Sequence, residues 1–439
     1  MRILILWSFW LVLAPWAAFA QTSHWDTAIK AAERAYDDGQ YREAESHYAR
    51  AQKEAESFGP DDHRLAVTLN NLGGLYLREA KYDEAEPLFK HALGIWEKAA
   101  SPRPVDMAAA LNNLAALYTH QSRYAEAEPL FRKCLALRES SLGPEHPAVA
   151  EALNNLGELY WEQGKLGEAE PLYQRAVFIK ERTLGPNDPE LATALNNLAG
   201  LYFRQGKYDE SESLYKRALS IREAAFGPEH PDVANSLNNL AALYSLEGRY
   251  SNAEPMYVRS LAIAEKSLGP DHPDVATCLN NLAELYRSEK KYPEAEPFFK
   301  RALSIRQKAL GPDNPLVAQS FDNLAGVLLL KYQQINVDLL YLRALEIKRK
   351  VYGPESPEVA SSLSSLGVAY TQEGKFREAE KALSDALTIA AKQPKPDPHT
   401  LAGVYLNLAN LYAREGKRGK AKKMAAKAKA LRDRVESSS

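Results

Sequence analysis

The sequence predicts an all-α solenoid of about ten helical hairpins, because one pattern recurs along the chain with a fixed period of 42 residues. A fixed period of this length is typical of solenoids, in which each repeat buries its apolar face only against its neighbours. Weaker copies extend the register to both ends, so we predict one solenoid over 21–439, with repeats at about 25–434. An asparagine pair marks each of the clearest copies, and these pairs begin at residues 70, 112, 154, 196, 238 and 280.

Each unit is predicted to contain two amphipathic helices, as residues 106–147 illustrate. Leu111, Leu114 and Tyr118 have the i, i+3, i+7 spacing of one helix face. A break follows at Ser122, where several other units have Gly, a residue that suits a helix C-terminus. A second helix then begins with carboxylates in its first turn, where the helix dipole favours negative charge.

The connection between units reads Leu-Gly-Pro-Glu-His-Pro at residues 142–147. Gly143 suits the end of one helix, Pro144 prevents its continuation, and Pro147 suits the first turn of the next. Each unit is therefore a helical hairpin that a short loop joins to the following hairpin. Cys134 and Cys278 lie more than three repeats apart, so we expect no disulfide between them.

The repeated segments at residues 112–118 (Asn-Asn-Leu-Ala-x-Leu-Tyr) and 124–131 (Tyr-x-Glu-Ala-Glu-Pro-Leu-Phe) resemble the tetratricopeptide repeat. The 42-residue period and the Leu-Gly-Pro-x-His-Pro linker resemble its kinesin-light-chain subtype. This resemblance implies a right-handed superhelix whose concave groove is lined by the first helix of each hairpin. It implies little about the ligand, because such repeats serve many partners. We find no heptad segment like the one with which kinesin light chains bind the motor.

The first twenty residues differ from the rest of the chain. Arg2 is their only charged residue, residues 3–13 form an apolar run, and Ala18-Phe19-Ala20 is a small-x-small cleavage motif. We therefore predict a secretory signal peptide over residues 1–20, and export to the periplasm or the extracellular space. An uncleaved anchor is the alternative, although a spanning helix needs about 20 apolar residues.

The second asparagine of each pair is predicted to point away from the hairpin core. At about 100° per residue, Asn113 lies near 200° from Leu111, on the side that faces the groove in tetratricopeptide folds. Two interpretations are open: the amides bind the backbone of an extended peptide, or they satisfy one another between repeats. We favour the first interpretation, in which the second asparagines form a peptide-binding ladder. The candidate ladder consists of Asn113, Asn155, Asn197, Asn239, Asn281 and Asn323, and Asn71 and Asn407 extend it.

Specificity is expected from groove positions that vary between repeats. Arg204 and Arg287 are candidates to bind an acidic side chain or a C-terminal carboxylate. Trp161 and Phe203 come from adjacent repeats and are candidates to clamp an apolar side chain. Packing between repeats is the alternative role for these two aromatic residues.

Two regions depart from the pattern. The unit at 321–350 lacks the turn glycine and helix-start carboxylates, and residues 327–330 form an apolar run that we expect to face outward. This run is either a partner surface or the result of drift. The last predicted helix, at about 418–435, is strongly basic. We expect it to cap the solenoid with a polar face, and contact with an anionic membrane surface or partner is the alternative.

Other chemistries are not expected. The formal net charge of −2 gives no argument for nucleic-acid binding, which usually needs a basic face. His146, His230 and His272 occupy equivalent linkers rather than one cluster, so we expect no metal site. The chain has no phosphate loop, nucleophile elbow or zinc-protease motif, so we expect no cofactor, no small-molecule substrate and no enzymatic activity.

The predicted function is a non-catalytic scaffold that binds an extended peptide or a helix of a protein partner in its groove. The alternative is a structural or assembly protein that acts through its outer surface or through self-association.

Overall fold

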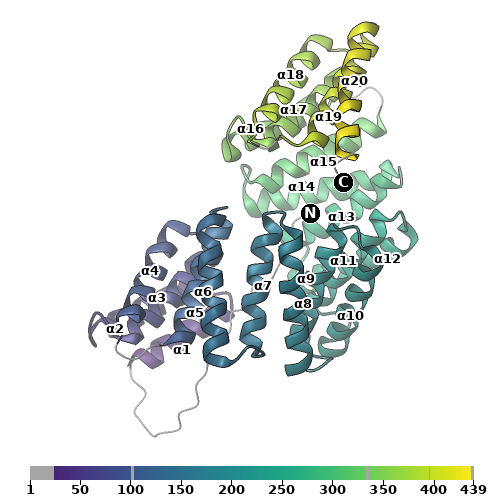
Figure 1. The fold of residues 1–439 in the computed structure, drawn as a ribbon. Helices are drawn as coiled ribbons and strands as arrows, with labels where there is room; N and C mark the ends of the chain where they lie inside the picture. The colour runs from purple at the N-terminus through teal and green to yellow at the C-terminus, as the bar shows by residue number, and fades with distance from the viewer. Residues whose placement is uncertain (1–23, 100–102, 333–335, 395, 437–439) are drawn as a thin grey trace. The chain divides into compact units, whose positions relative to one another are not determined.

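The computed structural model describes residues 24–99, 103–332, 336–394 and 396–436, and these form twenty helices and no strand. The predicted signal peptide over residues 1–20 lies outside the described residues. The chain divides into two compact units, residues 1–186 and 187–439. Each unit is an α-solenoid of the predicted kind, in which consecutive helices pack as hairpins and each hairpin packs on the next (Figure 1).

The first unit contains α1 (His24–Asp37), α2 (Tyr41–Glu56), α3 (His63–Arg78), α4 (Tyr82–Lys98), α5 (Pro104–His120), α6 (Tyr124–Leu142), α7 (Pro147–Glu162) and α8 (Leu166–Thr183). The second unit contains α9 (Pro189–Arg204), α10 (Tyr208–Phe226), α11 (Pro231–Leu246), α12 (Tyr250–Leu268), α13 (Pro273–Ser288), α14 (Tyr292–Leu310), α15 (Pro315–Lys331), α16 (Asp338–Tyr352), α17 (Pro357–Gln372), α18 (Phe376–Lys392), α19 (Pro398–Arg414) and α20 (Arg418–Glu436).

The helix boundaries follow from the punctuation in the sequence. Pro147 opens α7, and Gly143 ends α6 with a φ of 90°, a conformation that glycine adopts without strain. The turn inside most hairpins also needs a left-handed residue: Gly164 has a φ of 73°, and Ser122 takes the same conformation with a φ of 59°. The predicted hairpins and linkers are thus confirmed.

The linker histidines cap helices. In His146, His230 and His272 the ring Nδ1 accepts a hydrogen bond from the backbone N–H two residues further on, at 3.2 Å in each case. Asp188 performs the same task at the start of α9, with a distance of 2.8 Å. A side chain that accepts from the first turn satisfies a backbone donor that has no partner inside the helix. These histidines therefore have a structural role in the loops.

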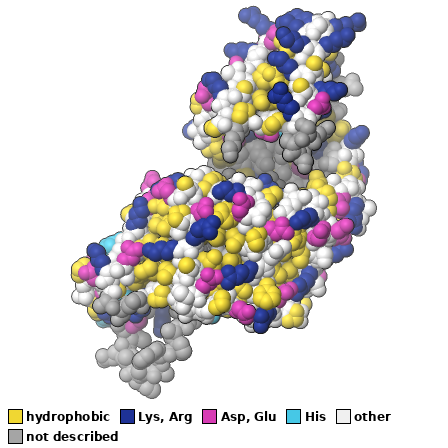
Figure 2. Space-filling view, viewed as in Figure 1, with side chains coloured by type: hydrophobic (Ala, Val, Ile, Leu, Met, Phe, Trp, Pro, Cys, Tyr) yellow, Lys and Arg dark blue, Asp and Glu magenta, His cyan; other side chains and the backbone are white. Residues whose placement is uncertain are grey.

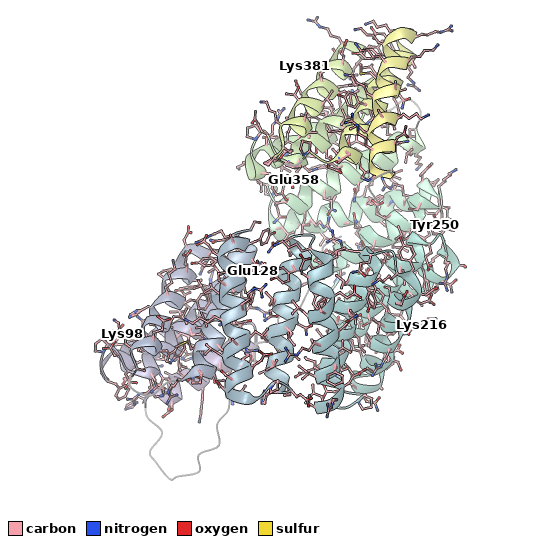
Figure 3. The ribbon with its side chains drawn as sticks, viewed as in Figure 1. Lys98, Glu128, Lys216, Tyr250, Glu358 and Lys381 are labelled. Carbon is pink, nitrogen blue, oxygen red and sulfur yellow. The ribbon has the colours of Figure 1, made fainter. Side chains whose placement is uncertain are left out.

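A tyrosine–glutamate contact joins successive hairpins and was not predicted. Tyr160 of α7 donates its hydroxyl to Glu128 of α6, with a distance of 2.8 Å (Glu128 is labelled in Figure 3). Tyr244 and Glu212 repeat the contact in the second unit, also at 2.8 Å. The sequence analysis took the repeated carboxylates as helix-start residues only, because their partner lies 32 residues away in the next hairpin.

The expected outward apolar run over 327–330 is wrong for most of its length. Val327 is fully buried, and Leu328 and Leu329 pack against the core clusters of the second unit. The run belongs to α15, whose turn of 3.6 residues directs only Leu330 to solvent, where it is 50% exposed. Among the described residues of this repeat, the most exposed apolar side chain is instead that of Leu339 on α16, at 76%.

The surface is mixed in character. Lys and Arg side chains alternate with Asp and Glu side chains over much of the face seen in Figure 2. Among the helices that the structure describes, none is long and apolar enough to cross a membrane. Cys134 and Cys278 are free thiols, as the spacing of the repeats predicts.

Candidate functional site

The second asparagines lie on the first helix of their hairpins. Asn155, Asn281 and Asn323 are half-buried, whereas Asn113 is buried and 7% exposed. Asn197 and Asn239 are also half-buried. Most of these amides are therefore partly accessible within their own unit, and their orientation towards a groove stays a prediction.

Hydrogen bonds between repeats fix several of these amides. The Nδ2 of the second asparagine donates to the Oδ1 of the first asparagine in the preceding repeat. The distances are 3.1 Å from Asn113 to Asn70, 2.6 Å from Asn155 to Asn112, 2.8 Å from Asn281 to Asn238 and 2.7 Å from Asn323 to Asn280. Asn407 donates in the same way to the hydroxyl of Ser364, at 3.0 Å.

The pairing between repeats occupies one side of each amide only. For Asn155 and Asn281, no hydrogen bond from a described residue reaches the Oδ1 atom. An amide carries two donors and one acceptor, so each rung keeps an acceptor for a further partner. Pairing between repeats and peptide binding are thus compatible, and peptide binding by the ladder stays a prediction.

Asn239 is an exception, because no hydrogen bond among the described side chains involves it. The first asparagine of the preceding repeat, Asn196, donates instead to the hydroxyl of Ser236, at 3.4 Å. Ser236 also accepts from the guanidinium of Arg222, at 3.0 Å, and the same guanidinium reaches Thr193, at 3.2 Å. A buried polar network here replaces the amide pair.

Arg222 belongs to a row of buried cations that the sequence analysis missed. Arg306 donates to Ser320, at 2.9 Å, and Lys348 donates to Ser362, at 2.8 Å. Burial lowers the pKa of Arg306 to about 10. In all three cases a serine lies fourteen residues after the cation. That spacing is a usable sequence feature, because a buried cation needs a hydrogen-bond acceptor in the next hairpin.

The predicted specificity residues occupy different surroundings. Trp161 is half-buried on α7 in the first unit, whereas Phe203 and the exposed Arg204 lie on α9 in the second. Phe203 packs against Tyr208, with ring centroids 6.2 Å apart. Arg287 forms an ion pair with Glu284 on the same helix, so its guanidinium already has one carboxylate partner. Binding of a ligand by these side chains stays a prediction.

Glu158 lies three residues after Asn155 on α7, and its sequence context does not mark it as unusual. It is half-buried on α7, and no ion pair or hydrogen bond between described residues involves it. Burial raises the pKa of Glu158 to about 8, and the negative charge of Glu162 adds to this increase. The candidate face thus contains a carboxylate whose charge is not compensated by a described side chain.

Within the described part of the chain, no group of three or more His, Cys, Asp or Glu residues could hold a metal ion. The polar groups of the candidate face are instead amides, single carboxylates and guanidinium groups. Such groups recognise a ligand by hydrogen bonds and charge.

A tetratricopeptide-repeat family model matches residues 27–98, 106–182, 190–266, 246–308, 279–334 and 340–392. No curated protein matches the chain.

Several solved structures are similar to the chain. The apo form of RapI is 13% identical and has a TM-score of 0.60, and the match covers 85% of this chain and 99% of RapI. The apo quorum sensor NprR from B. thuringiensis is 14% identical, with a TM-score of 0.57 and coverage of 83% and 97%. At these identities the likeness concerns the fold alone.

A putative kinesin light chain from Podosopora anserina with nearly identical TPR-like repeats is 25% identical, with a TM-score of 0.42 and coverage of 47% and 98%. The repeat length, the paired helices and the family match over most of the sequence agree with one another. The chain therefore belongs to the tetratricopeptide-repeat family.

Proposed function

We propose that this chain is a non-catalytic scaffold that holds an extended peptide, or a helix of a protein partner, along the face that carries the second asparagines. Tetratricopeptide repeats are a fold in which function resides in the surface residues grafted on a common frame. The observation that carries the proposal is the row of amides, such as Asn155 and Asn281, that are anchored through Nδ2 and keep Oδ1 for a ligand.

The anchoring itself favours binding. A side chain that is already held in one orientation loses little conformational entropy when a ligand pairs with it. Each rung then offers an acceptor to a backbone N–H of the ligand, at a spacing set by the repeat. Backbone pairing of this kind is independent of ligand sequence. Trp161, Phe203, Arg204 and Arg287 are proposed to supply the selectivity.

The partner is proposed to lie outside the cytoplasm. This part of the proposal depends on residues 1–20, whose apolar run and cleavage motif have the composition of a secretory signal peptide. N-terminal sequencing of the protein recovered from its native cells tests it. A mature chain that begins at Gln21 supports export, and an intact Met1 in a cytoplasmic fraction contradicts it.

Photocrosslinking from two matched positions tests the groove. Leu246 ends α11 in the groove-facing register and is 57% exposed, and Val258 lies on α12, the second helix of the same hairpin, and is 47% exposed. A photoreactive amino acid is placed at either position in the full chain. Groove binding predicts a crosslinked peptide or protein from position 246 and none from position 258.

The variant Asn239→Ala tests whether the ladder itself binds the ligand. It is suited to this test because no hydrogen bond among the described side chains depends on this amide. It is expected to abolish the product formed from position 246 while the circular dichroism spectrum is unchanged. A product that persists in this variant, or that forms equally from position 258, contradicts the ladder as the binding site.

Self-association through the outer surface is the second candidate function. It is favoured by the exposure of Leu339 and Leu342 of α16, at 76% and 40%. If these side chains join two copies, light scattering gives a dimer mass for the wild type and a monomer mass for Leu339→Lys. A monomer mass for the wild type at all concentrations excludes this function.

A further inference from the structure

The last helix, α20, carries a charge opposite in sign to that of the rest of the chain. It contains eight Lys and Arg residues against Asp433 and Glu436, which leaves a net charge of +6, whereas the whole chain has a formal net charge of −2. In Figure 2, dark blue Lys and Arg side chains gather around the segment that Figure 1 labels α20.

Capping of the solenoid explains why the outer side of α20 is polar, but not why its net charge is positive. Its apolar side is used for packing, because Ala428 is buried and Ala421 and Met424 contact the core cluster formed with α19. The outer side of a cap must be polar. The first described helix, α1, meets the same need with both signs, since Asp26, Glu33 and Asp37 accompany Lys30 and Arg34.

Most of the cations of α20 have no counter-ion. Lys420 forms an ion pair with Glu380, at 3.5 Å, and Lys427 lies 5.1 Å from the ring centre of Tyr405. No ion pair between described residues involves the exposed cations of a second group. This group consists of Arg418, Lys422, Lys423, Lys429 and Arg432.

Four of these cations lie on one side of the helix. At about 100° per residue, Arg418, Lys422, Lys429 and Arg432 fall within about 80° of one another, and Lys420 and Lys427 fall on the opposite flank. The four positions span about 21 Å along the axis at a rise of about 1.5 Å per residue. Like charges on neighbouring turns destabilise a helix, so the arrangement has a cost that capping does not require.

We propose that α20 docks on an anionic phospholipid surface, with Arg418, Lys422, Lys429 and Arg432 (the basic row) against the headgroup phosphates. A straight row of exposed cations is complementary to a planar array of anions. Because the apolar side of α20 packs on α19, the contact is electrostatic and does not insert into the acyl chains. This docking is independent of the peptide groove.

Two features favour lipid over nucleic acid. No residue of α20 is aromatic, and aromatic side chains are what single-stranded nucleic acids stack on. Five of the eight cations are Lys, a strongly hydrated point charge that suits diffuse attraction rather than bidentate contact with one phosphate. Each basic residue near an anionic membrane is expected to strengthen binding about fivefold.

Vesicle cosedimentation of the full chain tests the proposal. The probes are vesicles of phosphatidylcholine alone and vesicles in which about a third of the lipid is phosphatidylglycerol. We expect binding to the anionic vesicles only, and its loss near 0.5 M salt, because the Debye length then falls to a few ångströms. Neutralising the basic row with R418Q, K422Q, K429Q and R432Q is expected to weaken binding by more than a hundredfold.

A matched control removes the same number of charges elsewhere. It consists of K133Q, K216Q, K266Q and K300Q, which neutralise exposed lysines that are each paired with a carboxylate. Both variants keep the same N-terminal segment, and circular dichroism verifies that both fold. Unchanged binding by the control supports the basic row. Equal weakening in both variants, equal binding to neutral vesicles, no binding at all, or binding to duplex DNA in place of vesicles would each overturn it.

Discussion

Residues 155–161 of α7 and residues 281–287 of α13 occupy the same place in their repeats and differ in two side chains only. The first reads Asn-Leu-Gly-Glu-Leu-Tyr-Trp and the second Asn-Leu-Ala-Glu-Leu-Tyr-Arg. In both, the asparagine donates to the preceding repeat, at 2.6 Å and 2.8 Å. In both, burial raises the pKa of the glutamate, but only Glu284 has a cation beside it, Arg287, which opposes the increase.

The two helices show which side chains recur from repeat to repeat and which ones vary. The asparagine is part of the frame, because its hydrogen bond joins two hairpins. The position six residues later decides whether the groove carboxylate is compensated, with Trp161 in one helix and Arg287 in the other. A single side chain therefore changes the electrostatics of a repeat while the hydrogen bond of its asparagine to the preceding hairpin is kept.

The largest expected effect concerns the charge of Glu158. Its pKa is about 8 in the folded chain, above the ordinary value of 4.5, so the folded state binds the proton more tightly and the free energy of unfolding falls as the pH rises from about 4.5 to about 8. At about 1.4 kcal/mol for each pH unit, Glu158→Gln should remove up to ~5 kcal/mol of this decline. Chemical denaturation at several pH values measures it.

Glu284→Gln is the matched control for that experiment. Because Arg287 compensates Glu284, this variant should change the pH dependence much less, and it leaves Arg287 without its carboxylate. An equal change of the pH dependence in both variants would contradict the inferred difference between Glu158 and Glu284.

Exchanging Trp161 and Arg287 should exchange the pH dependence of stability between the two helices. Trp161→Arg places a cation three residues after Glu158, as in α13, and should lower the pKa of Glu158. A hydrogen bond between charged groups contributes about 1.5–3 kcal/mol, so about a third to a half of the decline in stability towards pH 8 should disappear. Arg287→Trp should create such a decline in α13. The same denaturation series measures both, and unaltered profiles would show that Arg287 does not control Glu284.

The smallest expected effect concerns the amides of Asn155 and Asn281. Removing either amide should lower the stability by a similar amount. Asn155→Ala and Asn281→Ala each remove one hydrogen bond between repeats and should each lower the free energy of unfolding by about 1 kcal/mol. Asn239→Ala removes no such bond and should be neutral or slightly stabilising, since Ala has the higher helix propensity. Equal losses in all three variants would contradict a structural role for the bond.

The sequence predicts the frame well, because the frame is periodic. The hairpins, the turn at Ser122 and the linker that begins at the C-terminus of α6 with Gly143 all follow from the pattern of one repeat. The partners of these residues do not follow, because they lie in the neighbouring hairpin. The bond from Asn113 to Asn70 joins residues 43 positions apart, and the contact of Tyr160 with Glu128 joins residues 32 apart.

The candidate site is predicted in outline only. The wheel places Glu158 and Glu284 at the same position, but it does not reveal that one of them has no described partner, because that depends on a neighbour three residues along the helix. The error at Val327 has a similar origin. An apolar run looks exposed when the repeat pattern is weak, although the turn of α15 buries most of it.

The hydrogen bonds of the asparagine row also give it a direction. The amides of Asn113, Asn155, Asn281 and Asn323 each donate towards the preceding hairpin, and no hydrogen bond between described residues runs from them towards the following one. The row is therefore a polar track, in which the two ends are not equivalent. A peptide that pairs with it would be held in one of its two possible N-to-C orientations, so a reversed copy of a ligand sequence should be distinguished from the original by the frame alone.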